Sequence, residues 1–292
     1  MKEQTVFALG FFDGVHLGHQ ALLRECRALA AEKECTSAVM TFRTHPAKFL
    51  KGAEPPRITT DEDRRSLLFS CGIDVVEERF FDKPTMETPW EDFMVKFLRP
   101  AGFVCGQDFR FGAGGLGTAQ ALAKWCEERE IPCVIVPDQQ LDGIRVSSTH
   151  IRSLLEKGDI AIANRFLGHP LQLTGTVQTG KALGRTIGIP TANLNLPEGF
   201  VKLPFGVYAC KALFDGKEFL AVTNIGTRPT VGGSHVTVEP WILDFDGDLY
   251  GKQITLQFFD FLRPEKKFDS LEELKAEIEK NAAQTRKLLE NS

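Results

Sequence analysis

The sequence has seven cysteines but no CxxC pair and no regular spacing between them. These absences argue against a zinc finger and against a disulfide framework, and they favour buried, reduced thiols. No apolar run approaches the length that spans a bilayer, and the N-terminus lacks the apolar core of a signal peptide. We therefore expect a cytoplasmic protein without a membrane partner.

The sequence also lacks a charge excess, because 35 Lys and Arg face 39 Asp and Glu, a net charge of −4. A protein that coats nucleic acid would be strongly basic, so we expect no nucleic-acid partner. Local basic clusters can still hold a small anionic ligand. The 292 residues are 42% hydrophobic, which is ordinary for a globular chain and leaves room for one or two domains. Charge and composition give no indication of a protein partner.

From residue 1 to about residue 160, short apolar runs alternate with amphipathic stretches. Strands are expected at 6–10, 37–42, 75–76, 102–105 and 133–136, and helices near 18–33, 60–71, 89–97 and 118–130. The alternation predicts an α/β domain with a parallel sheet covered by helices, a Rossmann-like arrangement. In such sheets ligands gather at the carboxyl ends of the strands.

A short helical connector ending near Pro170 separates this half from one with a different pattern. β-rich runs follow at 171–178, 207–214, 219–225, 236–245 and 253–259. They predict an antiparallel sheet or small β-barrel. Ser270 and Glu273 form a capping box that starts a C-terminal helix. We expect domains at residues 1–160 and 168–292.

The most informative segment is GFFDGVHLGHQ, which follows the first expected strand. His16 and His19 lie three residues apart where a helix would begin. The free N–H groups and the positive dipole end of a helix N-terminus favour phosphate, and imidazoles can stabilise charge that develops on its oxygens. Gly14 and Gly18 permit a sharp turn and a close approach of the backbone. An isolated HxxH is more often an ordinary cap, but this context favours a phosphate site.

A glycine-rich segment, CGQDFRFGAGGLGT, contains a literal GxGxxG at Gly112, Gly114 and Gly117. A helix, a strand and Asp138 follow, so a dinucleotide site is one alternative. The glycines begin six residues after the preceding strand, however, and Asp108 intervenes. We favour a glycine loop beside the ligand, with a plain surface loop as the remaining alternative.

A second helix start lies in GIRVSSTHIR, where Ser147, Ser148 and Thr149 offer hydroxyl and N–H groups. Arg145 and Arg152 flank it, and each can donate two hydrogen bonds to a phosphate. An ordinary helix cap would explain this segment alone. Together with the histidine turn, it indicates half of a triphosphate site.

The second half carries GKALGRTIGIPTAN, a basic glycine-rich loop suited to phosphates, although it lacks the P-loop order. Its glycines and basic residues are Gly180, Lys181, Gly184, Arg185 and Gly188. Thr191 and Asn193 offer oxygen ligands that suit Mg²⁺, or they simply form a turn into a strand.

A carboxylate, Glu239, lies within the expected strand VTVEPWILDF, on the same face as Trp241 and Leu243. A buried carboxylate is costly unless it is paired. The residues leave two readings open: a general base, or a glutamate at the barrel rim paired with Lys or Arg.

These motifs resemble, in order and over essentially the full length, the family of bacterial bifunctional riboflavin kinase/FMN adenylyltransferases. GFFDGVHLGHQ, GQDFRFG and RVSSTHIR resemble its nucleotidyltransferase motifs. LGHPLQLTGTV, GKALGRTIGIPTANL, NIGTRPT and LRPEKKF resemble its flavokinase module. The chain departs from the family pattern at His169, where arginine is frequent, and at Pro240-Trp241 after Glu239.

The resemblance implies two ATP-dependent steps, from riboflavin to FMN and from FMN to FAD, with Mg²⁺ as cofactor and flavins as substrates and products. His16 and His19 would stabilise the phosphates during adenylylation, Asp108 would lie on the flavin side, and Glu239 would be the base of the kinase, with Trp241 beside the flavin. Thr191 and Asn193 would bind Mg²⁺. The remaining residues implied in ATP binding are Phe11, Asp13, Gly14, Gly18, Arg145, Ser148, Thr149, Arg152, Gly180, Lys181, Gly184, Arg185 and Gly188.

Three other functions are alternatives. One module could have lost its activity, the chain could be a flavin-binding sensor or carrier, or the glycine loop could serve an NAD dehydrogenase. The intact histidine turn, the intact PTAN segment and Glu239 favour an active enzyme with both steps.

Overall fold

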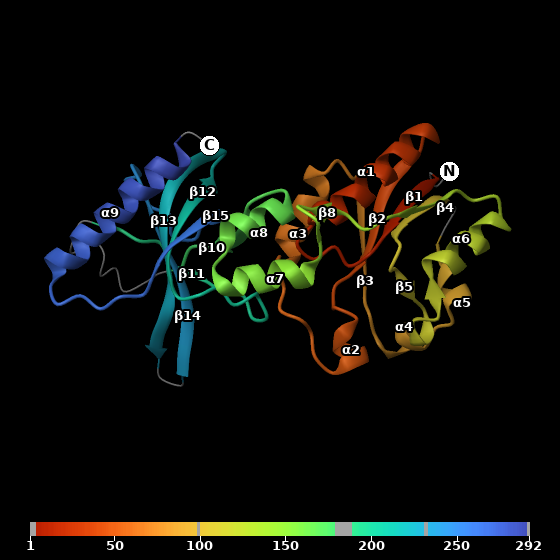
Figure 1. The fold of residues 1–292 in the computed structure, drawn as a ribbon, viewed down its shortest axis with the longest axis horizontal. Helices are drawn as coiled ribbons and strands as arrows, with labels where there is room; N and C mark the ends of the chain where they lie inside the picture. The colour runs from red at the N-terminus through yellow and green to blue at the C-terminus, as the bar shows by residue number, and fades with distance from the viewer. Residues whose placement is uncertain (1–3, 98–99, 179–188, 231–232, 291–292) are drawn as a thin grey trace. The chain divides into compact units, whose positions relative to one another are not determined.

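The computed structural model describes residues 4–97, 100–178, 189–230 and 233–290. Contacts within the chain divide it into two compact units (Figure 1). The first unit holds Met1–Pro55 and Arg64–Ser148, and the second holds Pro56–Asp63 and Thr149–Ser292. The short segment Pro56–Asp63 therefore belongs to the second unit, although the first unit surrounds it in the sequence. The functional boundaries at residues 160 and 168 stay a prediction.

The first unit is built on a five-stranded parallel sheet with the strand order β3-β2-β1-β4-β7. The strands are β1 Thr5–Leu9, β2 Thr36–Phe42, β3 Val75–Arg79, β4 Pro100–Gly106 and β7 Cys133–Val136. The helices are α1 Leu17–Glu32, α2 Ala47–Lys51, α3 Asp61–Ser70, α4 Lys83–Glu87, α5 Trp90–Met94 and α6 Ala119–Glu127. α3 belongs to this unit from Arg64 onward. Short hairpins add β5 Arg110–Phe111, β6 Gly117–Thr118, β8 Gln140–Leu141 and β9 Ile144–Arg145, with the 3₁₀ turn Ala113–Gly115 between β5 and β6.

Side-chain alternation along β1 explains why helices cover both faces of this sheet. Val6 and Ala8 pack with residues of α1 and α3, whereas Phe7 and Leu9 pack with residues of α5 and α6. Burying both faces accounts for the nearly continuous apolar sequence of the central strands. The predicted α/β class with a parallel sheet is confirmed.

The segment between β3 and β4 differs most from the expectation. We predicted one helix at 89–97, but α5 covers only Trp90–Met94 and a separate α4 precedes it. Asp82 caps α4 by accepting a hydrogen bond from the N–H of Thr85 at 2.9 Å. Thr88 follows α4 and precedes Pro89, and a residue before proline is driven out of the helical region, so the two helices stay separate.

The larger segment of the second unit starts within α7 Ser148–Lys157, whose first residue still belongs to the first unit, and continues with α8 Ile160–Leu167. A six-stranded antiparallel sheet follows, in the order β10-β15-β12-β13-β14-β11. Its strands are β10 Leu171–Thr176, β11 Leu194–Asn195, β12 Gly206–Phe214, β13 Lys217–Thr230, β14 Gly233–Ile242 and β15 Gln253–Pro264.

The edges of this sheet approach each other, because the N–H of Gln178, just beyond β10, donates to the carbonyl of Asn193 at 2.8 Å. The sheet is therefore a nearly closed barrel, as predicted. α9, Leu271–Leu289, packs on it through Ala282 and carries the predicted cap, with Ser270 accepting from the N–H of Glu273. β14 ends three residues earlier than expected, since Asp244 turns with a φ of 56°.

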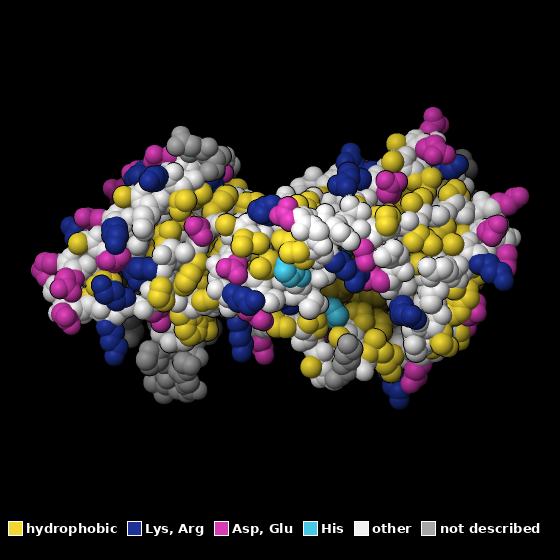
Figure 2. Space-filling model, in the orientation of Figure 1, with side chains coloured by type: hydrophobic (Ala, Val, Ile, Leu, Met, Phe, Trp, Pro, Cys, Tyr) yellow, Lys and Arg dark blue, Asp and Glu magenta, His cyan; other side chains and the backbone are white. Residues whose placement is uncertain are grey.

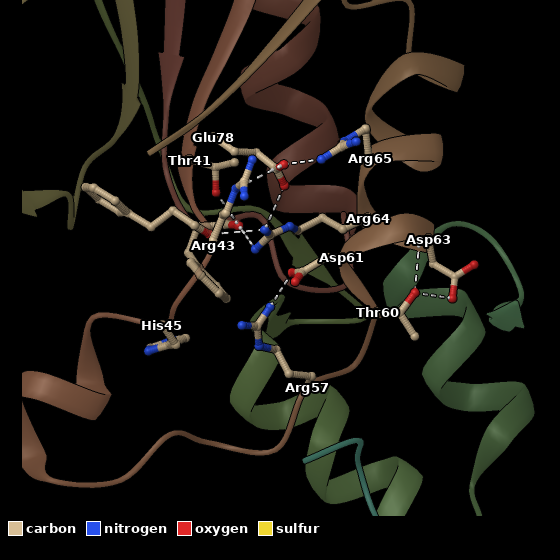
Figure 3. Close-up of polar contacts among 12 residues, drawn as sticks. Thr41, Arg43, His45, Arg57, Thr60, Asp61, Asp63, Arg64, Arg65 and Glu78 are labelled. Carbon is tan, nitrogen blue, oxygen red and sulfur yellow. Dashed lines mark hydrogen bonds and ion pairs between the residues drawn. The ribbon is translucent and has the colours of Figure 1, made fainter. Parts of the chain in front are cut away.

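Asp63 ties the segment Pro56–Asp63 to the barrel. Its buried carboxylate accepts hydrogen bonds from the N–H of Thr174 at 3.1 Å, from Oγ1 of Thr174 at 2.6 Å and from Gln172 at 3.2 Å. Thr60 adds a further donor at 2.7 Å (Figure 3). A buried carboxylate is stable only with such partners.

Among the described residues, no helix is long and apolar enough to cross a membrane.

Candidate active sites

The histidine turn lies at the topological switch point of the first unit. The chain leaves β1 towards β2 and β3, and it returns to the other side of β1 through β4 and β7. Ligands of open α/β sheets bind at the carboxyl ends of the strands beside such a point. The turn Phe11–Gly18 follows β1 directly, and the loop that holds Asp108 follows β4.

The backbone of the turn is tightly constrained. Phe12, Gly14 and Val15 have positive φ angles of 60°, 79° and 38°. Such a conformation is costly for Phe and Val, and it persists only where the surroundings enforce it. The carbonyl of Val15 accepts from the side chain of Gln20 at 3.0 Å, and Asp13 is almost fully buried. The turn is therefore held in one conformation ahead of any ligand.

His16 caps α1, since its Nδ1 accepts a hydrogen bond from the N–H of His19 at 3.3 Å. An accepting Nδ1 carries no proton, so the ring bears its hydrogen on Nε2. The two imidazole rings are stacked with their centroids 3.6 Å apart, and the ring of Phe12 lies 5.1 Å from that of His19. A side chain at Gly18 would come within 3.2 Å of the His16 ring, which explains the glycine.

The pKa of His19 lies well below its ordinary value of 6.5, first because the ring is buried and then because His16 and Arg64 are close. His19 is therefore neutral at pH 7. A neutral imidazole donates one hydrogen bond without the cost of a buried charge. Its buried Nδ1 has no hydrogen-bond partner among the described residues, as expected of a group that awaits a ligand.

The start of α7 reaches the histidine turn through Ser148, whose Oγ donates to the carbonyl of Asp13 at 3.1 Å. The structure thus brings two predicted phosphate segments together within the first unit. Thr149 and Arg152 belong to the second unit, where Nε of Arg152 donates to the carbonyl of Pro56 at 2.6 Å. Their role at the ATP phosphates stays a prediction.

Arg145 is held by two carboxylates. Its Nη2 contacts Asp108 at 2.6 Å and Asp138 at 3.0 Å, and its Nε contacts Asp138 at 2.8 Å. These contacts raise the pKa of Arg145 further, chiefly through the hydrogen bond to Asp108. The group of three charges is net negative, so in this structure Arg145 orients Asp108 at the end of β4. Its predicted contact with phosphate remains untested.

An apolar cavity of about 350 Å³ opens in the first unit. Figure 2 shows hydrophobic side chains around a hollow on this face. It is lined from four separate stretches of chain, by Met40, Phe42, Pro46, Leu50, Phe81, Thr85, Met86, Phe93, Phe109, Arg110, Phe111, Gly112, Gly114 and Gly115. Of this lining the sequence indicates only the glycine loop, because no local pattern marks a cavity assembled from distant segments.

The glycine loop does not form a dinucleotide site. Gly112 and Gly114 lie in the hairpin between β5 and β6, with φ angles of 70° and 62°. The dinucleotide fingerprint requires a turn directly from a strand into a helix, with the helix N-terminus at the pyrophosphate. Here the glycines form one wall of the apolar cavity, which agrees with the preferred reading of a loop beside a ligand.

In the second unit, Thr191 and Asn193 lie beside β14. Thr191 forms a bridge with Trp241, and the side chain of Asn193 is buried, with no hydrogen-bond partner for its Oδ1 in the part of the chain that the structure describes. Thr191 also lines a surface pocket with Phe245 and Tyr250. The predicted phosphate loop Gly180, Lys181, Gly184, Arg185 and Gly188 lies outside the described residues. No cluster of three His, Cys, Asp or Glu able to bind a metal occurs in the described part of the chain.

Glu239 lies opposite Asn224 in the β13–β14 pair, and its Oε1 accepts a hydrogen bond from Thr237 at 2.9 Å. We expected an apolar face around it. The buried residues of β14 are instead Val238, Pro240 and Ile242, so Glu239 lies on the half-exposed face. Trp241 shares that face and packs against an apolar cluster that includes Ala282 of α9.

In comparisons with known proteins, two family models match separate parts of the chain. Residues 1–150 match the model of the FAD synthetase family, and residues 167–289 match that of the riboflavin kinase family. A solved structure from Streptococcus pneumoniae, titled a macrolide-efflux protein, superposes with a TM-score of 0.88 at 30% identity, over 98% of this chain and 95% of that one.

Two relatives with the same description extend over almost the whole chain. The bifunctional riboflavin kinase/FMN adenylyltransferase of Listeria monocytogenes is 35% identical over 96% of this chain and 91% of its own length. That of Escherichia coli K12 is 38% identical over 95% of this chain and 90% of its own length. The chain therefore belongs to the family of bifunctional riboflavin kinase/FMN adenylyltransferases.

Proposed function

We propose that this chain phosphorylates riboflavin with ATP to give FMN, and then transfers the AMP group of a second ATP to FMN to give FAD and pyrophosphate. The observation that carries the proposal is the first unit's pairing of a preformed histidine turn with an apolar cavity. The turn is suited to phosphate, and the cavity has the volume and the aromatic lining that a flavin ring requires.

In the adenylylation step, a phosphate oxygen of FMN attacks the α-phosphorus of ATP, and the bond to the bridging oxygen of the β-phosphate breaks. His16 and His19 donate hydrogen bonds to the phosphate oxygens as charge develops on them. The N-terminus of α1 adds its N–H groups and the positive end of its dipole. Neutral donors suit this role because they bind ATP without a buried charge. Asp108, oriented by Arg145, faces the flavin side.

In the kinase step, the 5′-hydroxyl of riboflavin attacks the γ-phosphorus of ATP, and Glu239 accepts the hydroxyl proton. The hydrogen bond from Thr237 fixes the orientation of the carboxylate. Positioning and charge neutralisation supply most of the rate in phosphoryl transfer, so no covalent enzyme intermediate is required.

The oxygens near Thr191 fit a bound Mg²⁺. Oδ1 of Asn193 is buried and has no partner within the described ranges, and the hydroxyl of Thr191 is a second hard ligand close by in the sequence. These two residues would hold Mg²⁺, which neutralises charge on the ATP phosphates when bound. The seven free cysteines continue to favour a reducing compartment, and cytoplasmic location stays our expectation.

A product assay tests the proposal. Purified protein is incubated with riboflavin, ATP and Mg²⁺, and the flavins are separated by chromatography over time. Transient FMN followed by FAD supports both steps and their order. FMN alone would restrict the activity to the second unit. Tight flavin binding without conversion would favour a sensor or carrier.

A further inference from the structure

An arginine that no sequence motif marks lies against the histidine turn. Arg64 is 1% exposed and is the largest of the fully buried side chains described. Its Nη1 donates to the carbonyl of Phe11 at 3.2 Å, and its Nη2 donates to the carbonyl of Phe42 at 3.0 Å. Nη2 also forms an ion pair with Glu78 at 3.4 Å (Figure 3).

These contacts reach the carboxyl ends of three neighbouring strands. Phe11 follows β1, Phe42 ends β2 and Glu78 lies near the end of β3. A guanidinium is planar and carries five N–H donors in a fixed geometry, so one side chain can hold all three partners in register. The guanidinium also lies over the ring of Phe11, 4.7 Å from its centroid.

The carbonyl of Phe11, to which Arg64 donates, belongs to the histidine turn. Phe12 follows with its positive φ, and its ring packs against His19, which stacks on His16. A shift of the Phe11 carbonyl would therefore move both imidazoles. The hydroxyl of Thr41 donates to the same carbonyl at 3.0 Å and provides a second restraint.

Phe42, whose carbonyl is the second acceptor, lines the apolar cavity. Arg64 therefore also contacts the region proposed to bind the flavin. A single buried side chain thus binds the backbone of the phosphate turn and the backbone of the cavity wall. In a two-substrate reaction the separation of the two binding regions determines whether the attacking and reacting atoms meet.

We propose that Arg64 is a positioning residue for FMN adenylylation. It fixes the histidine turn relative to the apolar cavity, and hence the α-phosphorus of ATP relative to the phosphate of FMN. The inference rests on the function proposed above for the first unit. It assigns Arg64 no contact with either substrate.

The need to neutralise Glu78 does not explain why an arginine is buried at position 64. Arg65 also contacts Glu78, and Nε of Arg43 lies 4.0 Å from it, so the carboxylate keeps cationic partners without Arg64. Arg65 is half-exposed and donates to Glu78. Among the described contacts it makes none with the turn or the cavity, which makes it a matched control.

The experiment measures kcat and KM for FMN adenylylation in R64M, R64K, R65M and wild type, with riboflavin phosphorylation measured on the same preparations. R64M and R64K are expected to lower kcat for adenylylation roughly 10- to 100-fold, because a misplacement of about 1 Å has effects of this order. KM for ATP should change less than about twofold, since the phosphate-binding groups remain, and riboflavin phosphorylation should be unchanged. R65M should match the wild type in both reactions.

Adenylylation by R64M at the wild-type kcat would overturn the proposal. Full activity in R64K would also overturn it, since charge alone would then suffice. If R64M does not fold, T41V decides, because it removes the other hydrogen bond to the Phe11 carbonyl with little change in volume. A several-fold loss of kcat in T41V supports the proposal, and an unchanged kcat contradicts it. A wild type that makes no FAD from supplied FMN would refute the proposed function instead.

Discussion

The imidazole rings of His16 and His19 lie stacked, with their centroids 3.6 Å apart and their planes 12° from parallel. Two positive charges at this separation would repel each other strongly, so at most one ring is protonated at a time. Burial lowers the pKa of His19, so this ring stays neutral. The pair therefore acts on phosphate through hydrogen bonds more than through net charge.

His19→Ala should abolish FAD formation from FMN while riboflavin phosphorylation continues. Removing one preorganised donor from developing negative charge costs about 100- to 1000-fold in kcat. Both reactions are measured on the same protein, so the kinase rate controls for folding. An equal loss of both products would show that the two steps do not use independent sites.

His19 should not titrate near its ordinary pKa of 6.5. Burial favours the neutral ring, so the folded chain binds fewer protons at His19 than the unfolded chain does. This contribution to stability is complete above pH 6.5 and is lost as the pH falls from there towards the folded pKa. Histidine ring NMR signals, assigned with H19Q, should show His19 unchanged from about pH 7.5 to about pH 6. A midpoint close to 6.5 would contradict the burial argument.

Glu239→Gln should stop riboflavin phosphorylation and spare the adenylylation of supplied FMN. The amide keeps the size of the side chain but cannot accept the hydroxyl proton, and general-base catalysis contributes about 100- to 10,000-fold. Glu218→Gln is the matched control, since Glu218 lies in the same sheet, is half-exposed and pairs with Lys211. A Glu239→Gln variant that phosphorylates riboflavin at the wild-type rate would leave Glu239 as a rim residue.

The sequence predicted those features that local patterns encode. Apolar runs located the parallel strands, and β7 was placed without error at Cys133–Val136. The histidine turn was found because glycine, histidine and a strand end occur within one short segment. The barrel was recognisable from the change to β-rich runs after Pro170.

The remaining features depend on contacts between distant segments. Arg64 lies on a helix whose sequence looks polar and exposed, and only the folded sheet brings the carbonyls of Phe11 and Phe42 to it. Asp63, its neighbour, is buried through contacts with β10, more than a hundred residues away. The hydrophobic periodicity of the sequence does not predict that Arg64 or Asp63 is buried, since both side chains are charged.

Gly112→Ala should weaken the use of FMN in adenylylation, whereas Gly114→Ala should not. Both glycines have positive φ angles and so carry similar backbone strain on substitution. A Cβ at Gly112 would lie 2.4 Å from Cβ of Trp90, whereas at Gly114 the nearest atom is 3.8 Å away. The clash must displace the loop that lines the cavity, and we expect KM for FMN to rise about tenfold, a loss of about 1.4 kcal/mol in binding. Steady-state kinetics of both variants, with riboflavin phosphorylation as the internal control, measure the difference. Equal KM values for the two variants would show that this hairpin does not bound the flavin site.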